Sequence, residues 1–99
     1  MIYENNVPAI GEVLALEFIE AMNISQTDLG NALGVSQDLL NDIISGKRGI
    51  SADIDLRLCK YFGLTDGYFT GLQMDFERIA AKQKLEKELD KIIPFKAVS

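Results

Sequence analysis

Two short helical patterns, each preceded by a serine and separated by one glycine, restrict the possible folds of this 99-residue chain. Ser25 stands before the first pattern and Ser36 before the second. A serine at such a position accepts a hydrogen bond from a backbone N–H of the first helical turn. Gly34 stands where the first helix should end, in a left-handed conformation that glycine adopts without steric cost. Two helices joined by so short a step predict a helix-turn-helix over about residues 25–46.

A plain antiparallel pair of helices would carry the same caps. Gly30 lies four residues before Gly34 and has no side chain to keep the second helix at a distance. Val35 is placed to fill the turn with an apolar side chain. Both residues favour the crossed helices of a helix-turn-helix over the hairpin.

Helical patterns flank the motif on both sides. A first helix is predicted over residues 11–22, after Pro8, which is tolerated at a helix start. Its apolar residues recur mostly at helical spacing: Val13, Leu14, Leu16, Phe18, Ile19 and Met22. After the motif, Ser51 is the expected N-cap of a fourth helix that buries Leu58 and Phe62.

A fifth helix is predicted to begin near Tyr68, with Thr65 or Asp66 as its N-cap, and to end before Pro94. Apolar residues near its C-terminus form a stripe at helical spacing: Leu85, Leu89, Ile92 and Ile93. The stripe either packs back on the first helix or forms a surface for another chain. We favour a dimer interface, because so small a domain leaves little else for the stripe to cover.

The chain is long enough for one modest hydrophobic core. We therefore expect a single all-α, compact five-helix domain over residues 1–76, followed by a C-terminal helical extension over residues 77–99.

Composition excludes several classes of function. The chain has no histidine and a single cysteine, Cys59, so it offers neither an internal disulfide nor a zinc site of several cysteines. It shows no glycine-rich phosphate loop and no nucleophile beside a base, which argues against an enzyme. The N-terminal residues show no basic segment followed by an apolar one, as a secretory leader would. No apolar run elsewhere is long enough to cross a bilayer. We expect a cytoplasmic binding protein with no cofactor, no metal and no membrane partner.

The formal net charge of −5 is unevenly distributed. Residues 1–71 carry four basic and ten acidic side chains, whereas residues 72–99 carry six basic and five acidic ones. Binding to nucleic acid normally draws on Lys and Arg contacts to phosphate, so this balance is unusual for a DNA-binding protein. An acidic front domain suits a basic protein partner.

The geometry of a helix-turn-helix nominates the residues that would contact DNA. Its first helix lies across the backbone and its second inserts N-terminal residues into the major groove. Gln26 and Thr27 are placed to donate to a phosphate, and Ser36 offers a hydroxyl at a helix N-terminus for another. Gln37 and Asn41 are the candidate base-reading residues, since a side-chain amide can pair with N6 and N7 of adenine.

Three further residues near the recognition helix have two interpretations each. Asp38 is able to accept from cytosine N4, but it is more simply explained as complementing the helix dipole. Lys47 and Arg48 follow the helix and form either a phosphate clamp or an ordinary solvated turn.

Asp55 interrupts the apolar face of the fourth helix. Either the helix rolls to expose the carboxylate, or the carboxylate accepts backbone hydrogen bonds, because burial without a partner is costly. Cys59 on the same helix is interpreted as a small core residue.

The stretches at residues 25–29 and 43–51 resemble the Xre-type, λ-repressor-like helix-turn-helix family. The residues Gly11 to Leu14, Glu17, Phe18, Glu20, Leu72, Gln73 and Phe76 look specifically like its HigA/VapI antitoxin branch, and the resemblance covers roughly residues 8–76. It implies a small dimeric antitoxin that represses its own operon and binds a small basic, ribosome-dependent mRNA-endonuclease toxin. The alternatives are a stand-alone Xre-type regulator and a toxin-binding module with little affinity for DNA.

Overall fold

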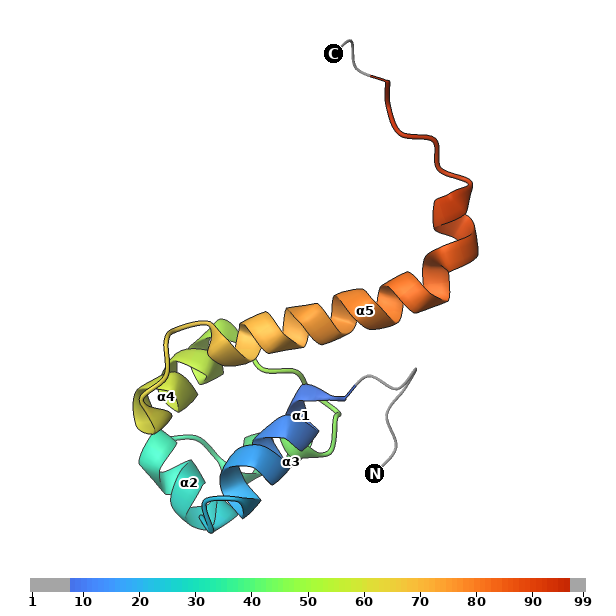
Figure 1. Ribbon diagram of the computed structural model, residues 1–99. Helices are drawn as coiled ribbons and strands as arrows, with labels where there is room; N and C mark the ends of the chain where they lie inside the picture. Colours follow the sequence, from blue (N-terminus) through green and yellow to red (C-terminus); the bar gives the residue numbers. More distant parts are fainter. Residues whose placement is uncertain (1–7, 97–99) are drawn as a thin grey trace.

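The computed structural model describes residues 8–96 and is built from helices alone in that range (Figure 1). The helical segments are α1 (Ile10–Val13), η2 (Leu14–Glu20), α2 (Gln26–Leu33), α3 (Gln37–Ile44), α4 (Ala52–Phe62) and α5 (Tyr68–Asp90). Because α1 continues directly into η2, the described residues form five helices. The all-α, five-helix fold predicted from the sequence is confirmed.

The first helix differs from the prediction in its hydrogen bonding. Its second part, η2, is a π-helix, in which a backbone N–H bonds to the carbonyl five residues earlier rather than four. The Ala21 N–H accordingly donates to Leu16 O at 3.2 Å, and the Ile24 N–H to Ile19 O at 2.9 Å. Apolar spacing alone did not distinguish this wider turn from an α-helix, because the buried residues Leu14 and Phe18 are four positions apart, which an α-helix would also place on one face.

The core draws side chains from every helix. Its buried members are Ile10, Val13, Leu14, Phe18, Leu29, Leu33, Leu40, Ile43, Ile50, Ile54, Leu58, Cys59 and Phe69. Cys59 is fully buried, as expected of a small core residue. At the crossing of α1 and α3, Gly11 lies so close to Ile43 that an added Cβ would overlap its carbonyl oxygen. The absence of a side chain at Gly11 therefore sets the separation of these two helices.

Local caps fix the turn between α2 and α3 as the sequence predicted. The Ser25 Oγ accepts from the Asp28 N–H at 2.9 Å, and the Ser36 Oγ accepts from the Leu39 N–H at 3.1 Å. Gly34 ends α2 with a φ of 73°, in the left-handed region. Val35 packs against the core.

The predicted N-cap of α5 is wrong. Neither Thr65 nor Asp66 caps this helix; its N-cap is Gly67, which has no side chain to do so. Asp55 of α4 supplies the acceptors instead, because its buried carboxylate accepts from the N–H groups of Gly67 at 2.7 Å, Phe69 at 2.9 Å and Thr70 at 3.0 Å. Of the two interpretations of Asp55, the structure supports the hydrogen-bonded carboxylate.

The long α5 packs on the core only with its first turns, through Phe69, Leu72 and Phe76, and then leaves the domain (Figure 1). The apolar stripe predicted at the C-terminal end stays exposed: Leu85, Leu89, Ile92 and Ile93 do not pack back on the first helix. The helix ends at Asp90, so the last two of these residues lie past it. The predicted boundary between residues 76 and 77 falls inside this continuous helix and stays a prediction.

Candidate nucleic-acid interface

Three side-chain amides join the start of α2 to α3. The Gln26 Nε2 donates to Asn41 Oδ1 at 2.5 Å and to Gln37 Oε1 at 3.5 Å. In return, the Gln37 Nε2 donates to the backbone carbonyls of Gln26 at 3.2 Å and Thr27 at 3.3 Å. Gln26, which was predicted to contact phosphate, is thus connected to both residues that were predicted to read bases, Gln37 and Asn41.

Gln37 is held against α2 by the close crossing of the two helices. It is half-buried, and a Cβ on Gly30 would overlap its Nε2. Both amide hydrogens of Gln37 have backbone acceptors on α2, so in this conformation the residue has only acceptor capacity left. Pairing with adenine N6 and N7 would require this amide to turn away from α2.

Asn41 is better placed to read a base. It is exposed on α3, and its Oδ1 has a second lone pair beside the one that Gln26 uses. Thr27, Ser36 and Asp38 are exposed as well, around the facing ends of α2 and α3. Of the predicted residues in α2, the turn and α3, four are thus exposed, while Gln26 and Gln37 are half-buried.

Lys47 and Arg48 are exposed in the loop directly after α3. The Arg48 N–H donates to Asp42 O at 3.1 Å, which folds the loop back on the end of α3. Further along, Gln73 of α5 holds the loop from the other side: its Oε1 accepts from the Ile50 N–H at 2.6 Å and its Nε2 donates to Ile50 O at 2.9 Å. The basic pair is thereby fixed relative to α3 and α5.

Replacing Gln73 with alanine should lower the free energy of unfolding by about 2 kcal/mol, because both backbone groups of Ile50, a buried residue, lose their partner. Chemical denaturation in urea measures this, and Gln83→Ala, at an exposed position on the same helix, is the control. Equal losses in the two variants would contradict the assigned role of Gln73.

Two residues that support this surface, Arg57 and Gln73, carry no local sequence signal for this role. Arg57 of α4 donates from Nη1 to the Leu33 carbonyl at the end of α2, at 2.8 Å, and pairs with Asp53 at 2.6 Å. Gln73 belongs to the residues that resemble the antitoxin branch, but that resemblance does not indicate its partner. Both act on residues more than twenty positions away, so no local pattern could have indicated their partners.

The charge on this surface is unusual for a DNA-binding protein. Asp38 and Asp42 lie on α3, and no lysine or arginine precedes Lys47 in the whole sequence. The positive charge nearest to α3 in the sequence is the pair Lys47 and Arg48. On this surface, the groups able to donate to a phosphate are therefore this pair, helix N-termini and neutral polar groups.

The crossed α2 and α3, with their caps, left-handed turn and polar outer face, define the chain as a helix-turn-helix protein of the DNA-binding class. The helix-turn-helix family model matches residues 16–69. Virulence-associated protein I of Dichelobacter nodosus is 37% identical over 93 residues, which are 92% of this chain and 85% of that protein. The chain belongs to the helix-turn-helix family, in its HigA/VapI branch.

Solved structures agree over the whole described fold. The Pseudomonas aeruginosa antitoxin HigA, solved with the higBA promoter, has a TM-score of 0.80 at 34% identity and covers 92% of this chain and 100% of its own. The antitoxin GraA in complex with its operator has a TM-score of 0.82 at 30% identity, covering 98% of this chain and 99% of its own.

Two further observations concern residues 8–96 only. None of their helices is long and apolar enough to cross a membrane. Their carboxylate side chains and the single thiol, that of Cys59, form no group of three or more that is suited to a metal ion.

Proposed function

We propose that this chain is the antitoxin of a type II toxin–antitoxin module. It binds operator DNA as a homodimer and neutralises a small basic mRNA-endonuclease toxin, acting in the cytoplasm as a binding protein and not as an enzyme. The amide network of Gln26, Gln37 and Asn41 at the crossing of α2 and α3 carries the DNA-binding half of the proposal. The likeness to antitoxins solved with promoter and operator DNA supports both halves.

Each residue of the interface has a proposed role. Asn41 reads a base in the major groove, and Gln37 holds the first turn of α3 against α2 so that Asn41 is presented correctly. Gln26, Thr27 and Ser36 contact phosphate oxygens at the helix N-termini, together with Lys47 and Arg48. Asp38 complements the dipole at the start of α3.

These roles differ in how they respond to mutation and to salt. Asn41→Ala should weaken binding to the chain's own upstream duplex by about 10- to 100-fold and relax the preference at one base-pair position. Replacing both Lys47 and Arg48 with alanine should weaken binding to all duplexes and reduce the slope of log affinity against log salt by about two per protomer. Fluorescence anisotropy across a salt series measures both effects.

The matched control for these variants is Lys60→Ala, which removes an exposed lysine on α4, outside the interface. Lys60→Ala should change the base preference much less than Asn41→Ala does. It should change the slope of log affinity against log salt much less than the replacement of both Lys47 and Arg48 does. A preference that survives Asn41→Ala intact would remove this residue from the proposed readout.

The homodimer is proposed to form through an outward stripe on α5, made of Met74, Ala81, Leu85 and Leu89. With a helical repeat of 3.6 residues per turn, these positions lie opposite Phe69, Leu72 and Phe76, which face the core. Met74 is 60% exposed and Leu85 45% exposed, which is unusual for large apolar side chains on a helix. A second copy of the helix would cover both.

Leu85→Glu should convert the dimer to a monomer, because it places a carboxylate in the apolar stripe. Sedimentation equilibrium measures the association. Leu56→Glu is the control, since Leu56 is a comparably exposed leucine on α4. A Leu85→Glu protein that remains as dimeric as the control would show that the stripe is not the interface.

A second candidate is a toxin-binding module with little affinity for DNA. The two carboxylates on α3, Asp38 and Asp42, are the observation in its favour, because they lie on the helix that would face the phosphates. In that case the chain would bind its basic partner tightly but would bind its own upstream duplex no better than an unrelated one.

A further inference from the structure

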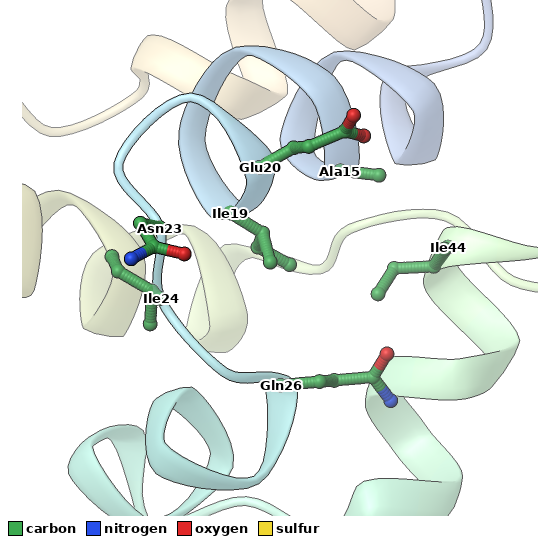
Figure 2. A pocket seen from close by; sticks show the side chains of 7 residues that line it. All are labelled: Ala15, Ile19, Glu20, Asn23, Ile24, Gln26 and Ile44. Atoms are coloured by element: carbon green, nitrogen blue, oxygen red, sulfur yellow. The ribbon is translucent and has the colours of Figure 1, made fainter.

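A groove of about 340 Å³ lies between η2, the loop after it, and the helix-turn-helix (Figure 2). Its lining residues come from both sides of that junction: Ala15, Ile19, Glu20, Asn23, Ile24, Gln26 and Ile44. In Figure 2, Ile19 and Ile44 point into the hollow, while Glu20 and Gln26 lie on opposite sides of it. The groove thus has an apolar interior and polar walls.

Only one lining residue is charged. Glu20 is exposed, and in residues 8–96 no lysine or arginine forms an ion pair with it. Glu17 is a second exposed carboxylate on the same helix, but it does not line the groove. Because the sequence has no basic residue before Lys47, nothing in the surrounding elements η2, α2 and α3 offsets this negative charge.

That charge distribution determines what the groove can accept. A phosphate group would be repelled by Glu20, so the groove is not an extension of the DNA-contacting surface, although Gln26 belongs to both. An apolar side chain would fill the hollow but would leave the carboxylate unused. A lysine or arginine side chain fits both features, because its methylene stem packs on apolar surface while its charged end stays at a polar rim.

We propose that this groove is the docking site for a lysine or arginine side chain of the basic toxin. The stem lies along Ile19, Ile24 and Ile44, and the ammonium or guanidinium group donates charge-assisted hydrogen bonds to the Glu20 carboxylate. This inference rests on the proposed function, which supplies a basic protein partner. It adds the surface of the antitoxin that this partner engages.

The test measures the affinity of the full chain for the small basic protein encoded beside its gene, by isothermal titration calorimetry. Glu20→Gln keeps the size of the side chain and removes its charge, and should weaken the complex by at least about tenfold. Ala15→Lys places a cation of the chain's own in the groove, one π-turn from Glu20, and should weaken it at least as much. Thermal melting checks that each variant is folded.

Glu17→Gln is the matched control, because it removes the same charge from the same helix outside the groove lining. Its affinity should stay within about threefold of the wild type. If the wild-type complex forms and Glu20→Gln weakens it no more than Glu17→Gln does, the docking site is wrong while the proposed function stands. If the wild-type chain binds no such protein, the toxin half of the proposed function and this inference fail together.

Discussion

Replacing Asp55 with alanine should lower the free energy of unfolding by about 3 kcal/mol, a large part of the stability of so small a domain. The substitution leaves three backbone N–H groups at the start of α5 without their acceptor: those of Gly67, Phe69 and Thr70. It also removes a negative charge from the N-terminus of a helix, where the helix dipole favours it. Urea denaturation followed by circular dichroism measures the loss.

Asp53→Ala is the matched control for this prediction. Asp53 precedes Asp55 by two residues on α4, but it is exposed and pairs only with the exposed Arg57, so its loss should cost less than about 1 kcal/mol. Asp55→Asn should fall between the two variants, because one oxygen still accepts while the new NH₂ group faces a donor. An Asp55→Ala protein as stable as the control would show that α5 does not depend on this cap.

The second large effect is expected at Gly11. In Gly11→Ala the new methyl group would overlap the Ile43 carbonyl oxygen and would lie 2.9 Å from its carbonyl carbon and 3.1 Å from the Ile44 Cα. These are backbone atoms of α3, which cannot rotate away as a side chain would. Either α1 moves outward or the end of α3 shifts, at a cost of about 1–3 kcal/mol or more.

Gly71→Ala separates this clash from the general effect of a glycine-to-alanine change. Gly71 lies inside α5, and a Cβ there would meet nothing within 4 Å. This variant should gain stability by about 0.5–1 kcal/mol, since alanine is the better helix former. In thermal melting, the midpoint should therefore fall in Gly11→Ala and rise in Gly71→Ala. A Gly11→Ala midpoint at or above the wild-type value would contradict the close crossing of α1 and α3.

The parts of the fold that the sequence predicted are those fixed by neighbours along the chain. Ser25 and Ser36 cap helices three residues on, and Gly34 ends a helix by its own conformation. The contacts that could not be predicted join distant residues. Asp55 caps a helix that begins 13 residues later, and Gln73 pairs with Ile50 across 23 residues. Such contacts depend on how the helices pack, which a local pattern does not contain.

The candidate site likewise contains residues whose position could be predicted from the sequence and contacts that could not. Its surface residues were predicted because helix geometry alone places Gln26 and Asn41 on the exposed side of the motif. The direction of the Gln37 amide was not predicted, because it depends on how closely α3 crosses α2 at Gly30. The groove beside Glu20 was not predicted either, because it forms between η2 and the helix-turn-helix and depends on how these elements pack.

The central claim is that an acidic recognition helix still reads DNA. Its most direct test is the affinity of the wild-type chain for a labelled duplex from its own upstream region, against a scrambled duplex, from low to physiological salt. We predict that at physiological salt the upstream duplex binds at least about a thousandfold more tightly than the scrambled one, with a shallow salt dependence because so few cations face the phosphates. Equally weak binding to both duplexes would contradict the claim and leave protein binding as the function.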